Sequence, residues 1–173
     1  MKVLIKKVKD LTKKEMSFIN TNRLKEFGAT VEEWQKDYLI ADTFLIKDEE
    51  DIVAFGMLMP IKIRYLNKNY NILGISSVIS VERKKGYGKK IINSMIDYAK
   101  PEKKTLIGFC QKHSKKFYEK CKIKLNKPLL KRFLYKNSIN KYEDYVIYHE
   151  GKDNLMKKLL STKLNIRLNG PFW

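Results

Sequence analysis

A basic turn containing two glycines is the part of this sequence whose residue types could do chemistry. Residues 83–89 read Arg-Lys-Lys-Gly-Tyr-Gly-Lys, and they join an apolar segment (72–81) to one with helical periodicity (86–99). Gly86 and Gly88 lack Cβ atoms, so the backbone N–H groups there can approach a ligand closely. The first N–H groups of a helix are unpaired and lie at the positive end of its dipole. The segment therefore predicts a phosphate-binding turn.

The cationic side chains of this turn add full positive charges around the same point. They are Arg83, Lys84, Lys85 and Lys89. The spacing excludes a Walker loop, because no G-x-x-x-x-G-K-[ST] is present, and it lacks the glycine spacing and βαβ frame of a dinucleotide fingerprint. The alternative is a helix whose start carries lysines in a lysine-rich chain.

Two segments resemble motifs of the GNAT superfamily of N-acetyltransferases. Arg83-x-x-Gly86-x-Gly88, with Val78 five residues before the arginine, resembles the acetyl-CoA-binding motif of that family. About 30 residues on, Phe117-Tyr118-Glu119-Lys120 resembles its F-Y-E-K signature. A predicted helix and strand separate the two, as the family's order requires, and the resemblance covers roughly residues 42–123. It implies a GNAT fold and an acyltransferase that uses acetyl-CoA as co-substrate and no metal.

The resemblance also implies roles for individual residues. The pyrophosphate of coenzyme A is expected on the turn, and the pantetheine arm beside the preceding strand, where an N–H group near Val78 would polarise the thioester carbonyl. The implied cofactor-binding residues are Ser76, Ser77, Val78, Arg83, Lys84, Lys85, Gly86, Tyr87, Gly88, Lys89 and Gln111.

The implied mechanism is direct attack of a primary amine on acetyl-CoA in a ternary complex. Tyr118 matches the family tyrosine that protonates the departing thiolate; otherwise it is an ordinary core tyrosine. Glu82, the carboxylate nearest to the strand end, is the candidate base and could equally be a solvated loop residue. Cys110 and Cys121 are expected to be packing residues, with an acetyl-cysteine at Cys110 as the minor alternative.

Three positions depart from the family pattern. Ser80 stands where proline is usual, and Gln111 replaces a frequent asparagine while keeping an amide. Lys122 and Ile123 occupy the usual Gly-Phe positions, so we expect the turn after the tyrosine helix to be altered.

The acceptor amine stays open between a small molecule and a peptide. The aromatic residues near Trp34 and at the terminus (170–173) resemble the aminoglycoside 2′-N-acetyltransferase branch. A positively charged surface repels polycations unless an acidic pocket overrides it. Four carboxylates could supply such a pocket: Glu32, Glu33, Asp37 and Asp42.

The elements around these motifs alternate between helical and strand periods. Capping boxes at Thr12-x-x-Glu15 and Thr30-x-x-Glu33 predict two helices after an opening strand (2–8), and Gly28 is a plausible stop between them. The predicted strands are 43–46, 52–58 continuing through 61–65, 72–81, 105–110, 133–135, 145–148 and 164–168, and the later helices are 86–99, 114–120 and 155–160. We expect an α/β (α+β) fold with a mixed central sheet of about six to seven strands flanked by helices, as one domain over residues 1–173.

The charge invites a second class of function. The chain holds 37 Lys and Arg against 19 Asp and Glu, a net charge of +18. Of the cations 32 are lysine and five are arginine, the residue preferred for phosphate and base contacts. This bias argues against a dedicated nucleic-acid role. The alternative to an enzyme remains a non-catalytic basic binding module, for nucleic acid or as an acyl-CoA sensor.

Length and cysteine content predict a single domain without disulfide bonds. A chain of 173 residues buries enough surface for one core without disulfides or metal, and two cysteines do not make a disulfide framework. No apolar run approaches about 18 residues, and the opening residues carry charge too early for a signal peptide. We expect a cytoplasmic protein, a monomer or homodimer, with no membrane partner.

Overall fold

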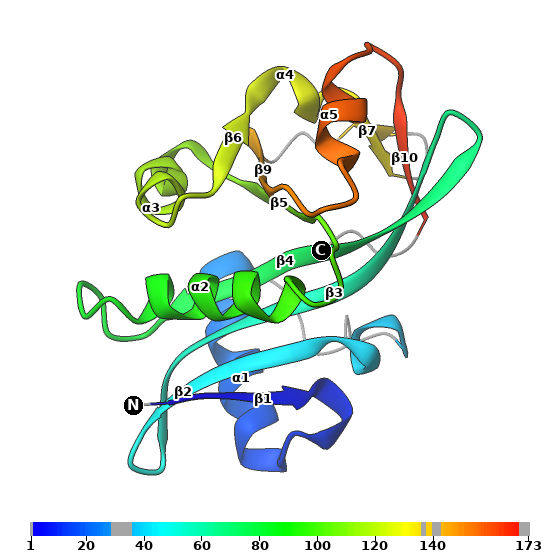
Figure 1. Cartoon of the computed structure of the whole chain (residues 1–173). Coiled ribbons are helices and arrows are strands. Elements are labelled where there is room, and N and C mark those ends of the chain that lie inside the picture. The colour runs from blue at the N-terminus through cyan, green and yellow to red at the C-terminus, as the bar shows by residue number, and fades with distance from the viewer. Residues whose placement is uncertain (1, 29–35, 136–137, 140–142, 170–173) are drawn as a thin grey trace. The chain divides into compact units, whose positions relative to one another are not determined.

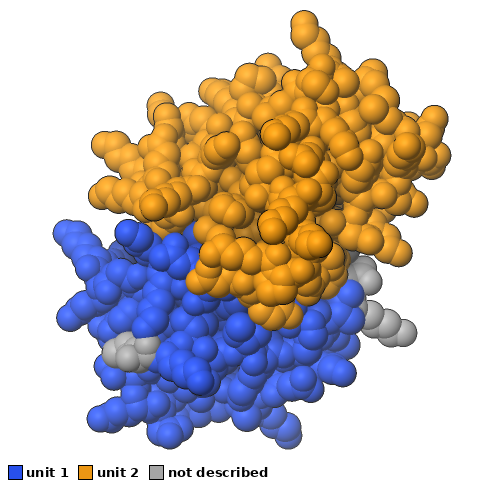
Figure 2. All heavy atoms as spheres, in the orientation of Figure 1, with its two compact units in different colours: residues 1–59, 76–95 blue, residues 60–75, 96–173 orange. Residues whose placement is uncertain are grey.

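The structure is a computed structural model that describes residues 2–28, 36–135, 138–139 and 143–169 (Figure 1). The chain divides into two compact units, each described here by itself (Figure 2). The first comprises residues 1–59 and 76–95, and the second residues 60–75 and 96–173. Two long strands, β3 (Asp51–Tyr65) and β4 (Lys68–Ser80), contribute to both units.

The first unit is built on antiparallel strands. β1 (Val3–Lys7) pairs with β2 (Asp42–Asp48), and β2 pairs with the first part of β3, which places Phe44 opposite Gly56. Short 3-10 helices follow β1 (η1, Val8–Asp10) and precede β2 (η3, Lys36–Ile40).

Helix α1 (Lys13–Phe27) begins and ends where its capping residues predict. The Thr12 hydroxyl accepts from Glu15 N at 3.2 Å, and Glu15 Oε2 accepts from Thr12 N at 2.9 Å, a complete capping box. Gly28 has a φ of +66°, the left-handed conformation that ends a helix. Ile19 of α1 packs in an apolar cluster with Leu45, Ile52, Phe55 and Ile79.

Helix α2 (Tyr87–Ala99) packs closely on β3 in the first unit. Ile91 and Met95 are fully buried. A Cβ atom at Gly56 would lie 2.7 Å from Ile91 Cγ2 and 2.7 Å from Met95 Cε, closer than packed carbon atoms approach. The absent side chain at Gly56 therefore sets how near the helix lies to the strand.

The second unit contains the remaining strands of a mixed sheet. The order is β6 (Lys124–Asn126), β9 (Tyr145–His149), β5 (Leu106–Cys110), β4, β3, β10 (Ile166–Asn169), β7 (Phe133–Tyr135) and β8 (Ser138–Ile139). β4 and β5 are parallel, with Leu73 opposite Leu106, whereas β5 and β9 are antiparallel. The helical segments are η4 (Lys112–Ser114), α3 (Lys115–Lys120), α4 (Lys127–Leu130) and α5 (Leu155–Leu160).

The expected fold class is confirmed, with a mixed sheet flanked by helices. The described residues form ten strands, more than the six to seven expected for the sheet. The eight strands placed along the sequence are all present, and the two that were missed, β6 and β8, carry too few residues for a period of two. Of the predicted second helix, residues 29–35 lie outside the described part and residues 36–40 form η3. The aromatic terminus at 170–173 also lies outside it.

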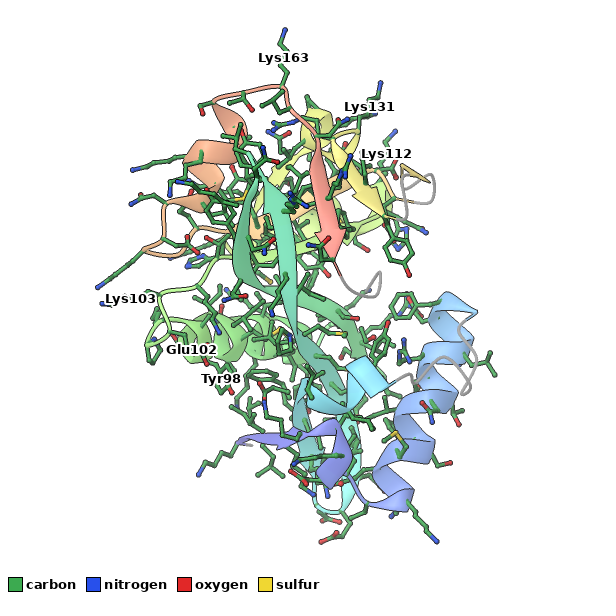
Figure 3. All side chains as sticks on the ribbon, turned by 90° about the vertical axis from the view of Figure 1, so that its right-hand side faces the viewer. Tyr98, Glu102, Lys103, Lys112, Lys131 and Lys163 are labelled. Atoms are coloured by element: carbon green, nitrogen blue, oxygen red, sulfur yellow. The ribbon has the colours of Figure 1, made fainter. Side chains whose placement is uncertain are left out.

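The excess positive charge is concentrated in one unit. The first unit carries 15 Lys and Arg against 12 Asp and Glu, and the second carries 22 against seven. Lys103 and Lys163 of the second unit extend away from the ribbon into solvent (Figure 3). The second unit has seven more cationic residues and five fewer carboxylates than the first, so both differences contribute.

Candidate functional site

The strand that precedes the glycine turn carries a local irregularity at the predicted pantetheine segment. Ser77 in β4 has a φ of +51°, which a residue with a Cβ atom rarely adopts. Ser76 beside it is 8% exposed, and the two hydroxyl oxygens lie 3.1 Å apart. A left-handed residue inside a strand interrupts the regular hydrogen bonding between strands and changes the direction of the neighbouring backbone N–H and C=O groups. Such a feature is typical of a strand that receives a ligand.

Arg23 of α1 supports this irregular residue. Its Nε–H donates a hydrogen bond to Ser77 Oγ at 3.1 Å. The guanidinium is 5.4 Å from the ring centroid of Tyr38, and the residue is 6% exposed. A buried arginine therefore holds Ser77, and no local pattern connects two residues that are 54 positions apart in the chain.

The turn after β4 is held by a backbone hydrogen bond to β3 and by one hydroxyl. Val81 N donates to Val53 O at 2.9 Å, and Ser80 Oγ donates to Glu82 O at 2.6 Å. Ser80, where the family usually has proline, thus restrains the turn by a hydrogen bond instead of a ring. Lys84 and Gly86 have φ values of +65° and +80°, so the turn uses two left-handed residues.

The first N–H groups of α2 lie at the end of this turn. The first helical hydrogen bond runs from Lys90 N to Gly86 O at 3.1 Å. The N–H groups of residues 87–89 come earlier in the helix and have no partner within it. Residues 82–86 are exposed, and Arg83 reaches Glu26 at 3.8 Å while 81% of its side chain stays exposed. This arrangement is suited to an anionic phosphate.

Glu82, the predicted base, is exposed on the same turn. Desolvation raises the pKa of Tyr87, and the charges of Glu82 and Asp48 raise it further. Glu82 therefore lies within electrostatic reach of Tyr87 at the start of α2.

In the second unit, Tyr118 is buried on the short helix α3. It is 8% exposed, and the ring of Phe117 meets it edge-on at 5.0 Å between centroids. Burial raises the pKa of Tyr118, and the nearby groups Cys110, Cys121 and Glu143 raise it further. The phenol therefore keeps its proton at neutral pH.

The turn after α3 keeps the conformation that glycine would adopt, so the expected alteration is wrong. Lys122 has a φ of +60°. Lys122 N donates to Glu119 O at 3.0 Å, and Ile123 N donates to Tyr118 O at 3.1 Å, which together make a Schellman motif. Ile123 is 3% exposed and supplies the apolar residue that accompanies this motif. Hydrogen bonding and burial hold the lysine in a left-handed conformation despite its Cβ atom.

Cys110 and Gln111 lie at the end of β5. Cys110 is 5% exposed, and burial raises the pKa of its thiol to about 12, with Glu143 and Asp144 contributing. A thiol in that state is a poor nucleophile at neutral pH. Gln111 is exposed, and its backbone oxygen accepts from Ser114 N at 3.0 Å.

Glu143 is a candidate functional residue that the sequence reasoning missed. It lies two residues before β9, and the next residue, Asp144, donates its N–H to Cys110 O at 3.1 Å. Burial raises the pKa of Glu143 to about 7, with the charge of Asp144 as the second cause. Nothing in the local sequence marks this glutamate, because its proximity to Cys110 arises from the pairing of β5 with β9.

Within ranges 2–28, 36–135, 138–139 and 143–169, no three His, Cys, Asp or Glu side chains gather as metal ligands would. No helix in the same ranges is both long and apolar enough to cross a membrane.

Comparison with known proteins assigns the family. The sequence model of the acetyltransferase (GNAT) family matches residues 6–122, which include the turn, β4 and α3. The chain therefore belongs to the GNAT family of acetyltransferases. No curated protein sequence matches it.

Solved structures share the fold at low sequence identity. A GNAT family N-acetyltransferase (YhbS) from Escherichia coli in complex with CoA aligns with a TM-score of 0.66 at 11% identity, over 98% of this chain and 91% of that one. ElaA from Escherichia coli aligns at 0.61 and 12%, over 86% and 99%. An acyl-CoA N-acyltransferase from Pseudomonas aeruginosa aligns at 0.59 and 15%, over 86% and 97%. These likenesses establish the fold.

Proposed function

We propose that the protein transfers an acetyl group from acetyl-CoA to a primary amine by direct attack of the amine on the thioester. The observation that carries the proposal is the turn between β4 and α2, with left-handed Lys84 and Gly86 and with residues 82–86 exposed just before the helix start. This geometry fits the phosphates of coenzyme A in a chain that belongs to the GNAT family. The solved relative bound to CoA supports the choice of cofactor.

The cofactor-binding residues follow from this geometry. The pyrophosphate is assigned to residues 83–89, where backbone N–H groups and cationic side chains supply donors without a metal. The pantetheine arm is assigned to residues 76–78, where the left-handed Ser77 interrupts the strand. Coenzyme A supplies the activated thioester; the chain binds, orients and protonates.

Direct attack is favoured over an acetyl-enzyme. Cys110 is buried and holds its proton at neutral pH, so it does not compete as nucleophile. Tyr118 is assigned the role of proton donor to the coenzyme A thiolate, because burial keeps its phenol protonated at neutral pH. A positioned proton donor contributes about 100-fold or more to such a step.

For the acceptor we propose a small-molecule or peptide amine and no aminoglycoside. Asp42, one of the four carboxylates expected to attract a polycation, is 5% exposed and pairs with Lys7 Nζ at 2.7 Å. Glu32 and Glu33 lie outside the described residues. The comparisons give no support to the aminoglycoside branch.

The proposal is tested by calorimetric titration with acetyl-CoA, using ADP as the phosphate-matched control, at moderate and high salt. We expect saturable, one-to-one binding of acetyl-CoA that survives salt and exceeds ADP binding at least tenfold. Equal, salt-sensitive binding of both would mean that the turn is only a basic patch. In that case the non-catalytic nucleic-acid module would replace the enzyme. Tight, salt-resistant binding with no turnover in an amine screen would instead support an acyl-CoA sensor.

A further inference from the structure

The carboxyl group of Glu143 is placed in an unusual environment. Its Oε2 atom is enclosed and, among the described residues, has no hydrogen-bond partner. The described part of the chain also gives this carboxylate no ion pair. A carboxylate held out of water without a donor is costly, and either a proton or a cation relieves that cost.

The backbone fixes this carboxylate beside the tyrosine helix. Cys110 at the end of β5 lies opposite Tyr145 of β9, which brings residues 143–144 to that end of the sheet. Asp144 N donates to Cys110 O at 3.1 Å, and Asp144 Oδ2 accepts from Lys112 N at 2.7 Å. The carboxylate of Asp144 thus accepts a hydrogen bond from the backbone, whereas Oε2 of Glu143 accepts none from the described residues.

Glu143 and Tyr118 belong to one cluster. An ionised Glu143 raises the pKa of both Cys110 and Tyr118, which shows that the three groups lie within electrostatic reach inside the second unit. The charged and titratable groups of this cluster are Tyr118 on α3, Cys121 after it, Cys110 on β5, and Asp144 beside Glu143. Of these two carboxylates, Glu143 has the oxygen that accepts no hydrogen bond from the described residues, so it is the one that can accept a proton.

We propose that Glu143 accepts the proton that the acceptor amine must lose before it attacks the thioester. This inference deepens the proposed function and rests on it. An alkylammonium ion gives one proton to the Glu143 carboxylate, and the neutral nitrogen then forms a bond to the thioester carbon. The carbon–sulfur bond breaks, the thiolate takes the Tyr118 proton, and the nitrogen returns a proton to Tyr118. Glu143 releases its proton to water, so the net products are an amide, a thiol and one proton.

The ionisation of Glu143 suits this task. A base works best when its pKa lies near the working pH, and burial raises the pKa of Glu143 to about 7. The group is protonated below that value and ionised above it. The rate with a basic amine should therefore rise as the pH passes upward through about 7.

The test compares two small nucleophiles on wild-type protein and Glu143→Gln. Methylamine is protonated at neutral pH and needs a base, whereas hydroxylamine is present mostly as the neutral form and does not. We expect Glu143→Gln to lower CoA release with methylamine about 100-fold and with hydroxylamine less than threefold. It should also remove the inflection near pH 7 from the methylamine pH profile, so that the remaining rate follows the neutral fraction of the amine.

Two controls separate the possible failures. Glu102→Gln removes a half-exposed glutamate of the same unit that pairs with Lys104, and it should leave both rates within twofold. Acetyl-CoA affinity, measured calorimetrically on each variant, should be unchanged. Equal losses with both nucleophiles, or no loss with either, would overturn the inference while leaving the proposed function standing. Failure of wild-type protein to bind acetyl-CoA would overturn both.

Discussion

The Nε–H of Arg23 in α1 donates a 3.1 Å hydrogen bond to Oγ of Ser77, the residue of β4 whose φ is +51°. The arginine also lies over the ring of Tyr38. A planar guanidinium can do both at once, whereas a lysine ammonium cannot. The conformation of the strand beside the proposed pantetheine segment thus depends on a buried side chain from another element.

Replacing this arginine by lysine should destabilise the first unit. We expect Arg23→Lys to lower the free energy of unfolding by about 1–3 kcal/mol, because a buried, charged hydrogen bond is lost. Arg64→Lys, at an exposed position of β3, should change it by less than about 0.5 kcal/mol. Urea denaturation measures both, and equal effects would show that Arg23 has no special role.

The phosphate-binding turn is tested by a pair of glycines with the same backbone requirement. Gly86 and Gly28 have φ values of +80° and +66°, and neither has an atom within 4 Å of an added Cβ. Both alanine variants should therefore suffer similar backbone strain. We expect Gly86→Ala to weaken acetyl-CoA binding at least tenfold and Gly28→Ala to leave it within twofold. Calorimetric titration measures the acetyl-CoA affinity of both variants. Equal affinities would show that residues 83–89 do not bind the cofactor.

The proton donor is tested by two buried tyrosines of equal exposure. Tyr118 and Tyr148 are each 8% exposed. We expect Tyr118→Phe to lower kcat about 100-fold with unchanged acetyl-CoA affinity, because only the phenolic hydroxyl is removed. Tyr148→Phe should retain kcat within threefold. A Tyr118→Phe enzyme with full kcat would show that the tyrosine serves packing alone.

The left-handed lysine after α3 predicts a stabilising substitution. Lys122→Gly keeps the Schellman hydrogen bonds and removes the clash of a Cβ atom at a φ of +60°. We expect the free energy of unfolding to rise by about 1 kcal/mol. Lys120→Gly, within the helix, should lower it by a similar amount. A destabilised Lys122→Gly protein would contradict the assigned turn geometry.

Glu15 predicts how stability depends on pH in acid. Burial alone would raise its pKa, but hydrogen bonds from Thr12 N, Lys6 and Lys47 outweigh burial and lower it to about 2. A lowered carboxyl pKa stabilises the fold above the unfolded value near 4.5, and this stability is lost as the pH falls toward 2. The loss should be about 2–3 kcal/mol. Glu15→Gln should show a correspondingly shallower fall in urea midpoint over this range.

The local features of the fold were the ones that the sequence predicted well. The capping box of Thr12 and Glu15, the stop at Gly28 and the turn at 83–89 each depend on residues close in the chain. Strand β10 was placed within two residues at either end. These elements obey capping rules and periodicity, which act within a few residues.

The parts that could not be predicted depend on long-range pairing. Glu143 acquires its environment because β9 pairs with β5, and Ser77 is held by an arginine 54 positions earlier in the chain. The turn at Lys122 was mispredicted because the sequence shows the residue type and not the hydrogen bonds that compensate for it. Propensity describes the local preference, and tertiary contacts overrule it.

The close packing at Gly56 has a consequence for how cofactor affinity could change in evolution. A methyl group added there would meet Ile91 and Met95, so α2 would have to shift along or away from β3. The start of that helix presents the N–H groups proposed to bind phosphate, so a shift would alter their aim. Gly56 contributes no atom to the proposed ligand contact, yet it sets the distance between α2 and β3. Its substitution would therefore weaken phosphate binding without changing the groups that contact the phosphate.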